Sequence, residues 1–193
     1  PVSLPEMAEV MCRYYDDLAA LVDRILSAMA LSLGLPADHF APLTDRHTSA
    51  LRLLHYPDLS GVEPEDGQLR AGAHSDYGTL TLLRQDDAPG GLEVLSRDGS
   101  WIPASPVDGA YVVNIGDALE RWTNGRWRST LHRVMLPPAD ANGSTDRQSI
   151  AFFHNANWNA VIDCLDPCRP ADPAELLPPI TAGRHLMEKF RRT

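Results

Sequence analysis

Two histidines and one aspartate have the side chains and the spacing to hold a metal ion. His74 and Asp76 are one residue apart, so an imidazole and a carboxylate can close on one cation, and His132 on a distant strand can complete a triangular face. Three ligands on one face of an octahedral ion leave the opposite face open, an arrangement that non-haem Fe(II) centres use. Small ligands can bind at the open positions.

Arg147 and Ser149 form a second candidate pair. Side chains on a strand repeat every two residues, so these two point to the same face if residues 147–153 form a strand. A guanidinium group meets a carboxylate with two parallel hydrogen bonds, and a hydroxyl adds a third donor. The pair therefore suits an organic anion, although a structural arginine beside a polar serine is the alternative.

Six segments in order resemble the Fe(II)/2-oxoglutarate oxygenases of the isopenicillin N synthase-like family. They are residues 51–57, 74–83, 90–94, 112–117, 122–125 and 129–134, to which the Arg147-x-Ser149 pair is added. The resemblance spans roughly residues 6–191. It implies an oxidoreductase, a dioxygenase that couples oxidative decarboxylation of 2-oxoglutarate to succinate with hydroxylation, desaturation or cyclisation of a small organic substrate.

The resemblance also implies roles for individual residues. His74, Asp76 and His132 would be the catalytic Fe(II) ligands, and 2-oxoglutarate would chelate the iron beside a position for dioxygen. The co-substrate's distal carboxylate would be held by Arg147 and Ser149. The interval from His132 to Arg147 is longer than usual in the family, with residues 139–145 as an insertion that a loop can absorb.

Three further residues are weaker candidates. Tyr56 lies on the strand that in relatives contributes a hydrogen bond to the co-substrate, but it can equally be an aromatic side chain that fills the barrel. Arg52 and Tyr77 are candidates for contact with substrate, with a solvated strand charge as the alternative for Arg52. Arg133 follows His132, so it must point away from the metal, where we expect it to pair with an acid.

Two other functions remain open. An iron-dependent oxidase of the same fold would use a similar Arg-x-Ser pair on another carboxylate and would not consume 2-oxoglutarate. A non-catalytic jelly-roll binding protein, or one with a structural metal, is less favoured, because structural zinc sites are usually closed by four Cys or His ligands and no fourth ligand is evident.

Composition limits which classes of partner and which cellular compartment are expected. The net charge is −9 and 44% of the residues are hydrophobic. This acidity argues against a nucleic-acid partner, which needs a basic face. No apolar run approaches the ~20 residues that cross a bilayer, so no membrane partner is expected. Three cysteines form no even disulfide framework and no signal peptide is visible, which favours a cytoplasmic protein.

The spacing of apolar and turn residues along the chain predicts mostly short strands around these candidates. Helical spacing covers residues 6–33 before Gly34, a turn or a single helical segment is expected within 116–124, and a terminal helix is expected at 181–192. The predicted strands are residues 51–56, 68–74, 79–84, 92–95, 110–115, 126–136, 147–153 and 161–164. Many short strands with regular turns indicate a sandwich or barrel. We predict a mainly β double-stranded β-helix, or jelly roll, with flanking helices.

We expect one oxygenase domain over residues 1–193. Its parts would be a helical flank at 1–50, a jelly-roll core at 51–165, and a C-terminal linker and helix at 166–193. Members of the family that it resembles usually carry an additional N-terminal segment, and nothing in this sequence matches it.

Overall fold

The computed structural model of the protein describes residues 3–59, 61, 63–138 and 140–191. The helices are α1 (Met7–Ser32), α2 (Ala41–Thr44), α3 (Asp117–Trp122) and α4 (Ala182–Phe190). The strands are β1 (Ala50–Tyr56), β2 (Ala71–His74), β3 (Leu80–Gln85), β4 (Gly91–Leu95), β5 (Trp101–Pro103), β6 (Val112–Ile115), β7 (His132–Met135), β8 (Arg147–His154), β9 (Val161–Ile162) and β10 (Ile180–Thr181). Residues 166–168 and 173–175 form short 3₁₀ turns. No described helix is long and apolar enough to span a bilayer.

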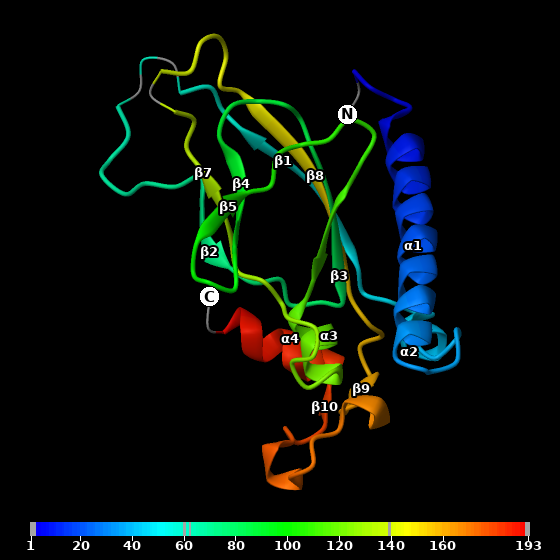
Figure 1. Ribbon diagram of the computed structural model, residues 1–193. Coiled ribbons are helices and arrows are strands. Elements are labelled where there is room, and N and C mark those ends of the chain that lie inside the picture. Colours follow the sequence, from blue (N-terminus) through cyan, green and yellow to red (C-terminus); the bar gives the residue numbers. More distant parts are fainter. Residues whose placement is uncertain (1–2, 60, 62, 139, 192–193) are drawn as a thin grey trace.

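Two antiparallel four-stranded sheets face each other (Figure 1). One has the order β1-β8-β3-β6 and the other β2-β7-β4-β5, so neighbouring strands, apart from β4 and β5, are far apart in the sequence. Strands that are consecutive in the chain often fall on opposite sheets, as β1 and β2 do. This is a double-stranded β-helix, which confirms the predicted fold. Strands β9 and β10 form a separate small ribbon.

The long helix α1 covers the outer face of the β1-β8-β3-β6 sheet (Figure 1). Its buried residues recur every four positions: Leu18, Val22, Leu26 and Ala30. They pack with Leu80, Leu82 and Phe152, which are the outward-facing residues of β3 and β8. The alternate residues of these strands face the other sheet. The main apolar core therefore lies outside the barrel and leaves the barrel interior for the candidate site.

Most predicted elements are confirmed, but four predicted strands, at residues 68–74, 110–115, 126–136 and 161–164, are longer than the observed β2, β6, β7 and β9. The differences are largest at β2 and β7. Residues 68–70 precede β2 without joining it, and residues 126–131 precede β7. The second error has a local cause: Asn124 (φ 49°) and Gly125 (φ 75°) turn the chain sharply after α3, so extended structure begins only at His132. Residue 192 of the predicted terminal helix and residue 139 of the predicted loop lie outside the described residues.

Candidate metal centre and its cavity

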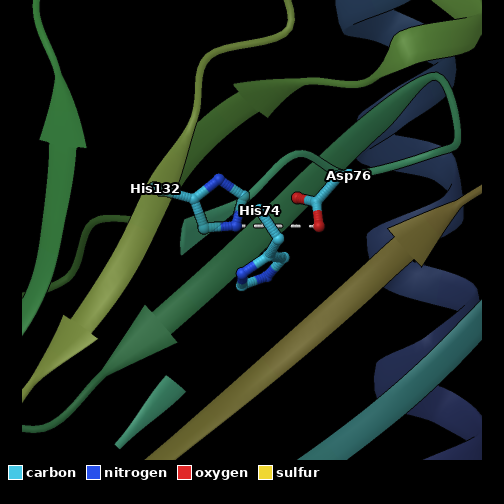
Figure 2. Close-up of side chains that lie close together, drawn as sticks. All are labelled: His74, Asp76 and His132. Carbon is cyan, nitrogen blue, oxygen red and sulfur yellow. Dashed lines mark ion pairs between the residues drawn. The ribbon is translucent and has the colours of Figure 1, made fainter. Parts of the chain in front are cut away.

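The two candidate histidines are cross-strand neighbours. His74 ends β2, His132 begins β7, and the antiparallel register places them directly opposite each other. Their ring centroids are 4.3 Å apart. Paired residues in a sheet project to the same face. The register therefore explains how two residues 58 positions apart in sequence come together (Figure 2).

Each imidazole is held so that its Nε2 is left for a metal. Nδ1 of His74 lies 2.7 Å from the carbonyl oxygen of Gly72, and Nδ1 of His132 lies 3.1 Å from that of Thr130. Because a carbonyl oxygen can only accept, Nδ1 must carry the proton in both rings. The lone pair is then on Nε2, and a backbone carbonyl on the other nitrogen is the usual support for a metal-binding histidine.

Asp76 completes the cluster from the bend after β2. It is buried, and its Oδ1 lies 3.7 Å from Nε2 of His132 (Figure 2). Its other oxygen, Oδ2, accepts a 2.5 Å hydrogen bond from Nδ2 of Asn114. One carboxylate oxygen is thus fixed by the protein and the other faces the histidines.

The donor set fits a divalent metal ion. One ligand atom from each of the three residues lies within 4.8 Å of the other two. Atoms bonded to one ion at ~2.1 Å are roughly 3–4 Å apart, so the side chains need to close only slightly. Two imidazoles and one carboxylate with open positions are the ligands of mononuclear Fe(II) sites. The structure thus brings together the three residues expected from the sequence.

The N-terminus of α3 fixes the loop that carries Asp76. Backbone N–H groups of Asp117 and Ala118 donate to the carbonyl oxygens of Asp76 (2.7 Å) and Gly78 (3.0 Å). The first N–H groups of a helix have no partner within it, so these contacts satisfy both elements. The two backbones can approach because residue 116 is glycine: a Cβ there would lie 2.3 Å from the Gly78 oxygen.

Asn114 is not among the candidate residues that the sequence analysis singled out. In the structure it donates the hydrogen bond that orients Asp76. A signal was present, because Asn114 interrupts an otherwise apolar strand at a position that alternation directs to the barrel interior. A polar side chain there needs a partner inside.

The cavity beside the cluster lies between the two sheets and has a volume of about 190 Å³. Besides the cluster it is lined by Arg147, Ser149, Tyr56 and Arg52, and by apolar residues of both sheets. Arg147 faces Tyr56 across the β1–β8 register, and its guanidinium lies 5.1 Å from the tyrosine ring centroid. All four candidates therefore share one cavity with the proposed metal ligands.

Arg147 is a buried cation with an unused donor. It is 2% exposed, and its Nη2 donates to Oε1 of Gln85 at 2.8 Å. Nη1 has no hydrogen-bond partner in the described part of the chain. A buried guanidinium is costly without an anion or a full set of acceptors. This orphan donor points to an anionic ligand in the cavity. Burial, and then the charge of Arg147, lower the pKa of nearby Arg70.

The expectation that Tyr77 contacts substrate is not met by its position, whereas the expected ion pair of Arg133 is present. Tyr77 does not line this cavity: its ring packs edge-on against Phe190 with centroids 5.7 Å apart, on the side of α4. The bend after Asp76 turns this side chain outward, so the structure does not bring it to the expected substrate site.

Arg133 does pair with an acid, since its Nη2 lies 2.8 Å from Oε2 of Glu93, and this confirms the prediction.

A jelly roll with two imidazoles, a carboxylate and a buried arginine in one interior cavity defines a class of proteins: those with an open site for one metal ion beside an anion site. The profile of the 2OG-Fe(II) oxygenase superfamily matches residues 47–156, which include every candidate residue of the cavity. The chain belongs to this superfamily.

Relatives agree with this assignment. A 2-oxoglutarate-Fe(II) type oxidoreductase of Emericella nidulans is 38% identical over 100% of this chain, and a proline hydroxylase of Petromyces alliaceus is 38% identical over 98%. The chain spans 55% and 61% of the lengths of these two relatives. The structure of a full-length Neurospora crassa protein in complex with alpha-KG and thymine superposes with a TM-score of 0.89, at 36% identity, over 98% of this chain and 57% of that one.

Proposed function

We propose that the protein is an Fe(II)- and 2-oxoglutarate-dependent dioxygenase that oxidises a small organic molecule. In the simplest outcome, hydroxylation, 2-oxoglutarate, dioxygen and a substrate C–H group give succinate, carbon dioxide and an alcohol. The observation that carries this proposal is the convergence of three ligand atoms and an unpaired buried guanidinium donor on one cavity.

His74, Asp76 and His132 would hold the metal. Two neutral imidazoles and one carboxylate give a ferrous site a net charge of about +1, which favours a dianionic co-substrate. Iron and 2-oxoglutarate, once bound, supply the oxidative decarboxylation and the oxidising power toward a C–H bond. Asn114 keeps Oδ2 of Asp76 occupied, so Oδ1 is the oxygen that remains free for the metal.

Arg147, Ser149 and Tyr56 would hold the distal carboxylate of 2-oxoglutarate. Arg147 and Ser149 are both buried and lie two residues apart on β8. Tyr56 packs beside the guanidinium and limits its movement. The arginine is therefore already oriented before the anion arrives, and little side-chain entropy is lost on binding.

The barrel interior would also shield the reaction from water. Leu54, Leu83 and Val134 line the cavity together with other apolar side chains from both sheets. A cavity lined in this way excludes water and strengthens electrostatic interactions within it. The apolar wall also suits the carbon skeleton of a small substrate.

The proposal is tested by succinate formation. We expect the chain, supplied anaerobically with Fe(II) and then with 2-oxoglutarate and oxygen, to release succinate, and Asp76→Ala to reduce release to background. Asp17→Ala, which removes an exposed carboxylate of α1, is the control and should retain activity.

The runner-up is an oxidase of the same fold that binds another carboxylate with Arg147. Bound iron together with no 2-oxoglutarate-dependent succinate, in the presence of a broad substrate panel, would favour that oxidase and contradict the proposal. A binding protein without catalysis would retain its organic ligand in Asp76→Ala.

Domain organisation and compartment belong to the same proposal. The fold is consistent with one oxygenase domain over the described residues, in which the helical flank supports the jelly roll. Cys12, Cys164 and Cys168 are free thiols. Reducing compartments keep thiols free, which supports a cytoplasmic setting.

A further inference from the structure

Arg52 is a cation of the cavity that the metal and co-substrate do not use. It lines the cavity from β1 and is solvent-exposed. Its guanidinium carbon lies 5.6 Å from the ring centroid of Phe153, another lining residue. Within the described part of the chain the guanidinium of Arg52 forms no hydrogen bond or salt bridge. Its donors are therefore available to a ligand.

Arg52 and Arg147 lie at different levels of the barrel. In the β1–β8 register, Arg52 is opposite Ala151, whereas Arg147 is opposite Tyr56. Four residues along a strand correspond to roughly 13 Å. The Arg52 guanidinium lies against Phe153 and that of Arg147 against Tyr56, toward opposite ends of this register, so a carboxylate held by Arg147 leaves Arg52 unneutralised.

The charge of the loaded cavity leads to the same conclusion. Among the described lining residues, Arg52 and Arg147 are cationic, Asp76 is anionic, and both histidines are taken as neutral. Fe(II) and the 2-oxoglutarate dianion cancel each other. One positive charge then remains in a protein whose net charge is −9.

We propose that Arg52 binds the carboxylate of the substrate, so that the enzyme acts on small organic monoanions. This inference rests on the proposed function. Phe153 covers a face of the guanidinium and leaves its N–H edge for a ligand, and this edge is the part that meets a carboxylate with two hydrogen bonds. The apolar wall would take the carbon skeleton. Arg52 thus acts as a specificity residue.

The test compares acids with amides of the same shape. Phenylacetate with phenylacetamide, and hexanoate with hexanamide, are titrated anaerobically by ligand-observed NMR into the chain loaded with Fe(II) and 2-oxoglutarate. We expect each acid to bind about 10-fold or more tightly than its amide, because a charge-assisted hydrogen bond contributes that much. Arg52→Gln should remove this preference, and Arg52→Lys should retain part of it.

The control is Arg84→Gln. Arg84 is exposed on β3 of the same sheet and does not line the cavity, so this variant loses the same charge elsewhere. It should keep the preference for acids. Equal binding of acids and amides, no binding of either acid, or the same loss in Arg84→Gln would overturn the proposal. Failure of 2-oxoglutarate to bind, with an acid site that still depends on Arg52, would instead refute the proposed function and leave the anion site.

Discussion

At the scale of single residues, the site depends on hydrogen bonds that leave chosen atoms free. Backbone carbonyls occupy Nδ1 of His74 and His132, and Asn114 occupies Oδ2 of Asp76. In each case the atom that faces the cluster is the one that these supporting groups leave open. With the proposed metal, such contacts would orient the three side chains before the ion binds and reduce the entropy lost on binding.

Replacement of Asn114 by alanine should weaken metal binding without removing a ligand. Asp76 would lose its fixed orientation, and partners of this kind typically contribute about 10- to 100-fold in metal affinity. Anaerobic titration with Fe(II) or Co(II) measures the change. Asn159→Ala, at an exposed turn before β9, is the control. Wild-type affinity in Asn114→Ala would show that the hydrogen bond does not position the carboxylate.

At the scale of elements, a tight contact between backbones couples α3 to the loop that carries Asp76. Gly116 precedes the helix, and Gly78 follows Asp76 and Tyr77 in the loop. A Cβ on either glycine would clash with backbone: with the Gly78 oxygen from residue 116, and with the His154 oxygen, at 2.2 Å, from residue 78. The loop is thus tightly packed between α3 and the end of β8.

Gly116→Ala should therefore destabilise the fold and the site together. Forcing a methyl group into a filled space typically costs about 1–3 kcal/mol, and here it must separate α3 from the loop that carries Asp76. Urea denaturation measures the loss, and metal titration measures the effect on the site. Gly72→Ala is the matched control, because a Cβ at residue 72 meets nothing within 4 Å and its φ is not positive. Equal effects in the two variants would rule out the contact as the cause.

Sequence reasoning was strongest where a pattern is local. The spacing of apolar residues in α1 and the alternation in β8 reflect burial directly, so both elements were predicted closely. The side-chain partner of Asp76 and the outward turn of Tyr77 were not predicted, because each depends on a segment distant in the chain: β6 for the first and α4 for the second. Periodicity indicates which face a side chain occupies and leaves its partner undetermined.

At the scale of the whole molecule, one buried histidine makes the stability of the fold depend on pH. His154 is fully buried at the end of β8, and its Nδ1 lies 2.6 Å from Oγ1 of Thr79. Its Nε2 has no partner in the described part of the chain. A protonated ring would bury a charge with one N–H unsatisfied. Burial, and then the neighbouring His47, lower the pKa of His154 from 6.5 to about 3.

The sign of the pH effect follows from this shift in pKa. The unfolded chain takes up a proton at His154 near pH 6.5, whereas the folded chain resists it down to about pH 3. The stabilisation is therefore complete above pH 6.5 and is lost as the pH falls toward 3, with a slope of up to about 1.4 kcal/mol per pH unit for one proton.

His154→Gln should flatten the acid limb of the stability curve. The variant removes this proton uptake and keeps a group that can hydrogen-bond to Thr79. With EDTA present, we expect urea denaturation from pH 8 to pH 4 to show a shallower acid slope in the variant, by about one proton. Between pH 7.5 and 8 His154 is neutral in both the folded and the unfolded chain, so the slopes of the wild type and the variant should agree there. Parallel slopes over the whole range would mean that His154 becomes charged inside the folded protein without cost, and the burial of the ring would then have no electrostatic consequence.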